Sequence, residues 1–372
     1  MNYSKVGTIE GIFLICIGIL NHAILYLPKS IFNVCGNASI LNTIYISVIL
    51  LIFLIIFIKL YKPFYGQDIL DISKYLGGNI LKVLTGLLFI AFYFIMTSIM
   101  LRNFAEGVNL AYFSQVNIKV VLCIFILGVY IGNKFGKSSI IKCNTIIFFF
   151  MIISFTLLIV SVVPNIELNR VFPIWGNGIN SVFVQGIGNL YVFSGISIIF
   201  FISPMLRNPE SLNKIVLISY CIISVILFLI VAVLLLALNF LLEVTELSPI
   251  YLLVKSVNFG KFFQNPESIF ILVWILSIIS FLCVFSMLII TIMQKLLNLQ
   301  DSTALSGLIA NLTFIFTLIP RNFSDIIFVV SNLYKWFQIL LVFVYSFIVL
   351  GIAYFKKTKK SISKEVLNEW VF

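Results

Sequence analysis

The chain has 372 residues, of which 62% are hydrophobic and only 10% are charged. Soluble domains carry roughly 25% charged residues, so this composition excludes an ordinary soluble globule and indicates a multi-pass membrane protein. A formal charge of +11 would suggest nucleic acid as the partner of a soluble protein. Here the lysines and arginines lie in short loops between apolar runs, so we expect the charge to reflect membrane topology, with no nucleic-acid partner.

Ten apolar runs without charged residues approach or exceed the length of about 20 residues that a membrane-spanning helix needs. We predict one span in each: 11–28, 30–58, 83–101, 120–133, 143–166, 171–206, 215–242, 268–294, 302–320 and 336–355. Two-thirds of the 24 Lys and Arg then fall on the side of both termini, which predicts that the N- and C-termini are cytoplasmic. We expect no cleaved signal peptide, because only Lys5 precedes the first run and no small-residue cleavage site follows it.

The first run carries Gly18, Asn21 and His22 at its middle and reaches Pro28. The sixth run is interrupted in the same way by Gly186, Gly188, Asn189, Ser194, Gly195 and Ser197 before Pro204. Glycine and polar residues at such depth are costly unless they face a bundle interior or a cavity. Two interrupted spans at matching positions predict a 5+5 inverted repeat with broken helices 1 and 6 and a binding site between the repeats. Repeat one covers about 8–163 and repeat two about 181–355, in a single transmembrane domain over 1–355.

A broken helix exposes backbone N–H groups on one half and carbonyl groups on the other, which suits the two charges of an amino acid. We expect hydroxyl groups of the third and eighth spans to face the breaks: Tyr93, Thr97, Ser98, Ser277, Ser280 and Ser286. Each of them could equally be a helix-packing residue. The single histidine, His22, is expected to be neutral and hydrogen-bonded in a kink, with ligand contact or proton relay as the alternatives. No Asp or Glu lies in the middle of a span, which argues against a proton symporter.

No catalytic, metal-ligand or phosphate-loop spacing occurs, so we predict neither an enzyme nor a cofactor or metal site. Asp68 and Asp71 share one face of a short interfacial helix that ends near Gly77, and we expect a solvated face rather than a catalytic pair. Trp175, in the external loop 164–180, is expected to anchor at the interface, with a ligand lid as the alternative. The apolar middle of the external loop 239–267 is expected to lie on or re-enter the outer surface. The basic cytoplasmic tail over 356–372 is expected to contact anionic lipid or to dock a partner.

Several stretches resemble the B subunits of spore germinant receptors. The first span EGIFLICIGILNHAILYLPKS, the stretch DISKYLGGNILKVLTGLLFIAFYFIMTSIMLRNFAE and the stretch QGIGNLYVFSGISIIFFISPMLRNPE after VFPIWGNGI follow the order and spacing of that family. So does the tryptophan of WILSIIS in the eighth span. The resemblance covers nearly the whole chain.

This resemblance implies a ten-helix, LeuT/APC-like fold of the amino-acid/polyamine/organocation transporter superfamily, in the inner membrane of a bacterial spore. It implies a subunit that binds a small germinant, commonly an amino acid, beside A and C subunits and membrane lipid, and triggers germination. An amino-acid permease of the same fold, or a scaffold with a vestigial pocket, are the alternatives. The predicted ligand-binding residues are Gly18, Asn21, His22, Ala23, Tyr93, Thr97, Tyr191, Ser194, Gly195, Ser277 and Ser280.

Two positions depart from the family pattern. The family often carries a Glu near the break of the sixth span, where this chain has Ser194 and Gly195, and a Lys in the eighth span, where this chain has Ser280. The joint loss of both charges leads us to expect a different or less polar germinant.

Overall fold

The computed structural model describes residues 5–112, 115–238, 249–255, 266–299, 303–320 and 334–369, and these ranges are almost entirely helical. The main elements are α1 (Thr8–Cys35), α2 (Ser39–Tyr61), α3 (Ile69–Tyr112), α4 (Ile118–Lys134), α5 (Lys137–Val162), the π-helix η5 (Ser181–Gln185), the 3₁₀-helix η6 (Gly186–Ile198), α6 (Ile199–Ile202), η7 (Ser203–Met205), α7 (Leu212–Ala237), α9 (Pro249–Lys255), α10 (Pro266–Leu297), α11 (Thr303–Thr317), α13 (Lys335–Ile339), the π-helix η11 (Leu340–Tyr345) and α14 (Ser346–Glu369). Within the described ranges, the β-structure consists of one isolated bridge between Val6 and Leu206.

The protein is a multi-pass membrane protein. Seven helical stretches in the described ranges are long and apolar enough to cross a membrane. The first of these, Thr8–Phe64, contains both α1 and α2, whereas α4 and α11 have only 17 and 15 residues. Because the short helices fall below the usual spanning length, the count of ten spans stays a prediction.

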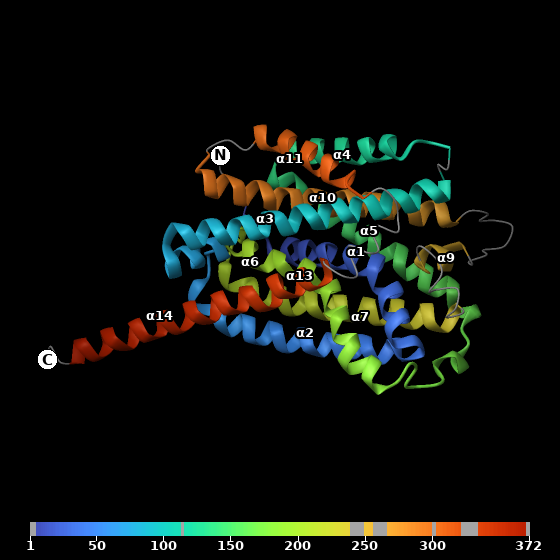
Figure 1. Cartoon of the computed structure of the whole chain (residues 1–372), viewed down its shortest axis with the longest axis horizontal. Coiled ribbons are helices and arrows are strands. Elements are labelled where there is room, and N and C mark those ends of the chain that lie inside the picture. The colour runs from blue at the N-terminus through green and yellow to red at the C-terminus, as the bar shows by residue number, and fades with distance from the viewer. Residues whose placement is uncertain are drawn as a thin grey trace.

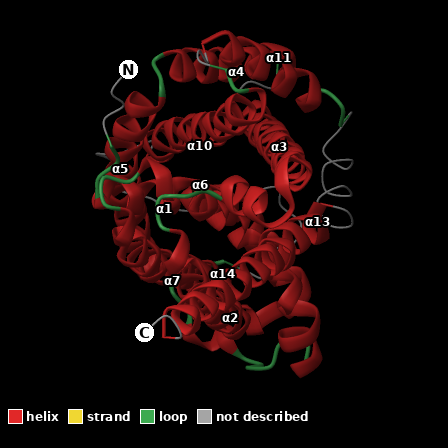
Figure 2. Cartoon of the chain, turned by 90° about the vertical axis from the view of Figure 1, so that its left-hand side faces the viewer, coloured by secondary structure: helices red, strands yellow, loops and turns green. Residues whose placement is uncertain are grey.

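The helix α1 and the irregular segment 181–205 form the centre of the molecule. Seen end-on, α1 and α6 lie in the middle, and α10, α3, α13, α14, α7 and α5 surround them (Figure 2). The lengthwise view agrees and shows α14 extending away from the other helices toward the C-terminus (Figure 1). The most apolar window of Ser181–Met205 is 94% buried, against 28% for Lys137–Asn165. The two segments that were predicted to form the binding site, α1 and 181–205, therefore belong to the core.

The first helix is not broken, contrary to the prediction. α1 continues as one α-helix from Thr8 through Asn21 and His22 and past Pro28 to Cys35. A proline removes one backbone hydrogen bond, but a membrane helix tolerates this where neighbouring helices cover it, and Pro28 is buried. The polar residues at mid-helix are accommodated by side-chain contacts with other helices rather than by an interruption of the backbone.

The second predicted break is present as irregular helix rather than as extended chain. The segment 181–205 passes from a π-helix to a long 3₁₀-helix, a geometry uncommon in runs of this length. Side chains of α1 and α2 bind its backbone carbonyls: the Sγ–H of Cys35 contacts the Ser181 oxygen at 3.5 Å, and the Asn42 amide donates to the Val182 oxygen at 2.7 Å. The Ser181 oxygen also accepts from the backbone N–H of Gly186, so the Cys35 contact adds to the backbone bonding of this segment.

The helix α3 bends near its start, as predicted. Gly77 and Gly78 have non-helical backbone angles, and Gly78 has a φ of 66°, so a short helix precedes the long one. The prediction that Asp68 and Asp71 are solvated was wrong for Asp68, whereas the Asp71 side chain is 35% exposed. Asp68 is buried, and the Lys295 Nζ at the end of α10 binds both carboxylates, at 2.7 Å and 2.5 Å. Burial raises the pKa of Asp68, and Lys295 opposes this shift.

The described parts of the outer loops and of the tail agree only partly with expectation. Of the loop 239–267, the structure describes α9, which packs against α1, α7 and α10, and the first two residues of α10, while 239–248 and 256–265 lie outside the described residues. Trp175 is 49% exposed. In α14, the Lys356 Nζ donates to the Tyr75 oxygen at 3.2 Å. The start of the basic tail therefore binds the end of the short helix before Gly77, where the free carbonyls of a helix attract cations.

Candidate functional site

His22 faces the irregular segment from α1. Its Nδ1 lies 3.1 Å from the backbone oxygen of Val192, and its ring packs against the rings of Tyr26 and Tyr191 with centroids 5.0 Å and 5.8 Å away. A carbonyl oxygen can only accept, so Nδ1 carries the proton in this contact. In a neutral imidazole, Nε2 is then a bare acceptor. His22 is 1% exposed, so this acceptor is directed into the protein.

Polar residues of η6 and α13 connect to these two tyrosines. Ser194 of η6 donates its hydroxyl to the Oε1 of Gln338 in α13, at 2.5 Å. Lys335, at the start of α13, places its Nζ 5.8 Å from the ring centroid of Tyr191. Tyr334 lies beside Gln338 and near both Tyr26 and Tyr191. We call these residues the His22 cluster: His22, Tyr26, Tyr191, Ser194, Tyr334, Lys335 and Gln338.

The cluster contains four buried polar atoms without a hydrogen-bond partner among the described residues. They are His22 Nε2, Tyr26 Oη, Tyr334 Oη and Gln338 Nε2. Tyr26 lies next to Asn103, and Tyr334 next to Gln338, but neither pair has the geometry of a hydrogen bond. Leaving a buried polar group unpaired costs about 1–3 kcal/mol. Four such atoms in one cluster indicate a place prepared for polar groups from outside the protein.

A second group of predicted residues lies around Tyr93 of α3. The Tyr93 ring packs among the rings of Phe89, Phe92, Phe201 and Phe285, with centroids between 5.0 Å and 6.0 Å away. Its hydroxyl lies toward that of Ser197, and neither oxygen has a partner among the described residues. Thr97 donates instead to the carbonyl oxygens of its own helix, at 2.8 Å and 3.1 Å. Tyr93 and Ser197 could contact a ligand, whereas Thr97 is already satisfied.

Gly18 and Gly195 mark the closest approach of α1 and η6. A Cβ on Gly195 would overlap the carbonyl of Gly18 and come within 3.0 Å of the Ile19 Cα. A Cβ on Gly18 would overlap only the end of the Ile198 side chain. The two glycines therefore permit the backbones to touch, and they do not line an open break. Ala23, between His22 and Ile24, is fully buried.

The remaining predicted residues join α10 to its neighbours. The Asn21 amide and the Ser277 hydroxyl lie within hydrogen-bond distance at 2.8 Å and 3.0 Å, and the Ser280 hydroxyl donates to Asn144 of α5 at 3.0 Å. Interhelical bonds of this kind hold membrane helices together. Although Asn21 and His22 are adjacent in sequence, they face different helices, and only His22 belongs to the cluster.

Four members of the cluster were not predicted: Tyr26, Tyr334, Lys335 and Gln338. Lys335 lies just outside the predicted span 336–355, where the sequence pattern places a loop. A signal was nevertheless present, since a Tyr-Lys pair is followed three residues later by a glutamine inside an apolar helix. Residues spaced by three or four positions share one helix face.

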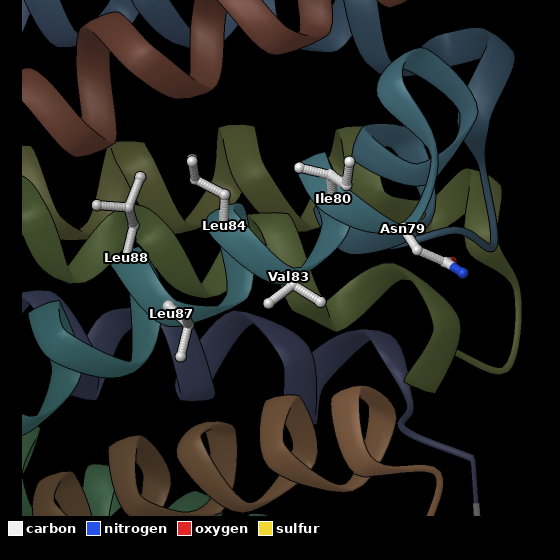
Figure 3. Close-up of a pocket in the computed structure, with 6 residues that line it drawn as sticks. All are labelled: Asn79, Ile80, Val83, Leu84, Leu87 and Leu88. Atoms are coloured by element: carbon white, nitrogen blue, oxygen red, sulfur yellow. The ribbon is translucent and has the colours of Figure 1, made fainter.

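Two grooves lie away from the cluster. One groove, of about 630 Å³, runs along the flank of α3 after the Gly77–Gly78 bend. It is lined by Asn79, Ile80, Val83, Leu84, Leu87 and Leu88, so its lining is aliphatic except for Asn79 (Figure 3). Ile80 is 84% exposed. The other, of about 290 Å³, lies between α2 and α7 and includes Ser47 and Tyr220. The first groove lacks the convergent polar groups that a small-molecule site needs.

Comparison with known proteins supports both the expected family and the expected fold. A family model described as "spore germination protein" matches residues 5–326. The spore germination protein B2 of Bacillus subtilis (strain 168) is 24% identical over 211 residues, which cover 56% of this chain and 57% of that relative, so the match extends over less than two-thirds of its length.

Among solved structures, the chain resembles a Na⁺-coupled sialic acid symporter in a substrate-bound, outward-open state. The TM-score is 0.58 at 12% identity, over 90% of this chain and 75% of the symporter. At this identity the likeness shows the fold alone, and that fold is the all-helical transporter architecture expected from the sequence. With its match over nearly the whole chain and its apolar helices, the chain belongs to the spore germination protein family.

Proposed function

We propose that this protein is the membrane subunit of a spore germinant receptor, in which a small germinant binds at the His22 cluster and triggers germination. The observation that carries the proposal is the set of four buried polar atoms without a partner among the described residues. They belong to α1, to α13 and to Tyr334 just before α13, and both helices pack against η6. In a transporter fold, substrates bind near the bilayer midplane beside irregular helices. The cluster lies beside the irregular helix η6 in a member of a spore germination family.

Of the residues predicted from the sequence, we propose that His22, Tyr191 and Ser194 contact the germinant, with Tyr93 at a neighbouring position. The helix-packing contacts of Gly18, Asn21, Ala23, Thr97, Gly195, Ser277 and Ser280 support a role in holding the site together. Their polar groups already make internal hydrogen bonds, and the glycines permit close backbone contact, so these residues have few polar groups left to bind a ligand.

The setting of this receptor is also a proposal. We place the subunit in the inner membrane of the spore, with both termini in the cytoplasm and receptor A and C subunits as partners. With the ten predicted spans, two-thirds of the 24 Lys and Arg fall on the side of the termini, which supports that orientation. The aliphatic groove beside Ile80 suits lipid hydrocarbon, because it offers apolar surface and no convergent polar groups.

Germination assays test the receptor function. In spores that lack other germinant receptors, deletion of this gene is expected to abolish the response to at least one germinant of a broad panel. Tyr26→Phe and Tyr334→Phe remove hydroxyls that bind nothing among the described residues, so these variants should accumulate normally and still respond poorly. Tyr220→Phe, whose hydroxyl donates to Ser47 at 3.1 Å, is the control outside the cluster. An unchanged response of the deletion strain to every germinant would contradict the proposal.

An amino-acid permease is the second candidate, because the fold resembles a Na⁺-coupled symporter. Uptake of labelled amino acids into proteoliposomes separates the two functions. Gradient-driven turnover above that of empty liposomes favours the permease, whereas saturable binding without turnover favours the receptor.

A further inference from the structure

Lys335 is a half-buried cation whose ammonium lies near two aromatic rings and near the Cys35 thiol at the end of α1. Its ammonium lies 5.8 Å from the ring centroid of Tyr191 and 6.0 Å from that of Trp336. Among the described residues, Lys335 forms no ion pair with a carboxylate. A lysine at a membrane interface usually extends toward water. Lys335 instead lies against Gly188 and Tyr191 of η6.

Gly188 makes this position of the lysine possible. A Cβ at Gly188 would overlap the Cε and Nζ of Lys335. The lysine end therefore occupies the space that any other residue at position 188 would fill with its side chain. Its ammonium is held one helical turn from Tyr191, whose ring also packs on His22.

The polar groups of the cluster are mainly donors. The Tyr26 and Tyr334 hydroxyls and the Gln338 Nε2 can each donate a hydrogen bond, and none has an acceptor among the described residues. The ammonium of Lys335 adds three donors. On the other side, the free Nε2 of His22 accepts. A ligand that satisfies this set carries a negatively charged acceptor group at one end and a hydrogen-bond donor at the other.

We infer that Lys335 is the residue that selects a carboxylate-bearing ligand at this site, with Tyr334 as its neutral co-donor. The inference rests on the proposed function, because Lys335 would bind the carboxylate of the same germinant in the same cluster. It also revises the expectation of a less polar germinant. The charge missing from the eighth span, at Ser280, is supplied by α13 instead. A donor group on the ligand then faces His22 Nε2, and an ammonium there would also meet the faces of Tyr26 and Tyr191.

The test compares acids with their amides. The purified full-length protein in lipid nanodiscs is titrated with L-amino acids and with the C-terminal amide of each, and binding is measured by ligand-induced thermal stabilisation. Wild-type protein is expected to bind at least one acid about tenfold or more tightly than its amide, since a charged hydrogen bond distinguishes the two. Lys335→Gln should lose that preference by weakening acid binding to the level of the amide, whereas Lys335→Arg should retain it.

Two further variants keep the test independent of folding. Gly188→Ala should displace the lysine end and reduce the acid preference while Lys335 is still present. Lys119→Gln, an exposed lysine beside the start of α4, should leave the preference unchanged. If Lys335→Gln binds acid and amide as wild type does, the inference is overturned while the site stands. If the protein binds only uncharged ligands such as nucleosides, the inference is again overturned. If binding is insensitive to Tyr26→Phe and Tyr334→Phe as well, the proposed site falls with it.

Discussion

Gly195 allows η6 to pack directly on the backbone of α1, because it has no side chain. Its Cα lies so close to α1 that an added methyl group would overlap backbone atoms of Gly18. Backbone atoms cannot move aside as a flexible side chain can. The position of η6, and with it that of Ser194 and the cluster, depends on this contact.

We therefore predict different outcomes for two similar substitutions. Gly195→Ala should destabilise the protein by about 3 kcal/mol, because it forces α1 and η6 apart. Gly18→Ala should cost less, since it meets only the end of Ile198. Thermal unfolding of the two variants in detergent provides the measurement. Equal stability of both variants would contradict the backbone contact.

Asn21 and His22 have different proposed roles: Asn21 joins α1 to α10, whereas His22 contacts the germinant. Ser277→Ala removes the hydroxyl that binds the Asn21 amide at 2.8 Å and should lower stability by about 0.6–1.7 kcal/mol, the range for hydrogen bonds between membrane helices. Germinant sensitivity of spores carrying Ser277→Ala should stay at the wild-type value. A shift of the germinant concentration needed for half-maximal response, without loss of protein, would instead bring Ser277 into the ligand site.

At the scale of elements, the short helix before Gly77 is held to two distant helices by charge. Lys295 of α10 binds Asp68 and Asp71, and Lys82 of α3 donates to the Lys295 carbonyl at 2.7 Å. Lys356 of α14 binds the other end of the short helix. These contacts close one end of the bundle, because they tie the start of α3 to α10 and α14.

Removal of Lys295 should loosen this end. Lys295→Met leaves two neighbouring carboxylates without their shared cation, and we expect a loss of about 2 kcal/mol together with faster hydrogen exchange over residues 69–76. The exposed Lys59→Met in α2 serves as control. Combining Lys295→Met with Asp68→Asn should restore part of the stability, because the buried charge is then removed too. Unchanged exchange over 69–76 in Lys295→Met would contradict the role of this contact.

At the scale of the whole molecule, apolar length and loop charge were enough to predict a helical membrane protein, and the Gly77–Gly78 pair was enough to predict the bend. The prediction of a break in the first helix was wrong. Asn21 and Pro28 interrupt the apolar pattern of the sequence, but the helix continues through both because neighbouring helices cover Pro28 and supply a hydrogen-bond partner for Asn21. Lys335 was missed for a related reason. A charge beside an apolar run is assigned to a loop by sequence alone, and only the packing of α13 on η6 brings it to Tyr191. The inverted repeat stays a prediction.

The most direct test of the account is a structure of the protein in lipid nanodiscs with its best-bound amino acid. The account predicts that the ligand lies between α1, η6 and α13. Its carboxylate should be within about 3 Å of Lys335 Nζ, and its donor group should face His22 Nε2. A ligand bound between α3 and α10, beside Tyr93 and Ser277 and away from Lys335, would contradict the account.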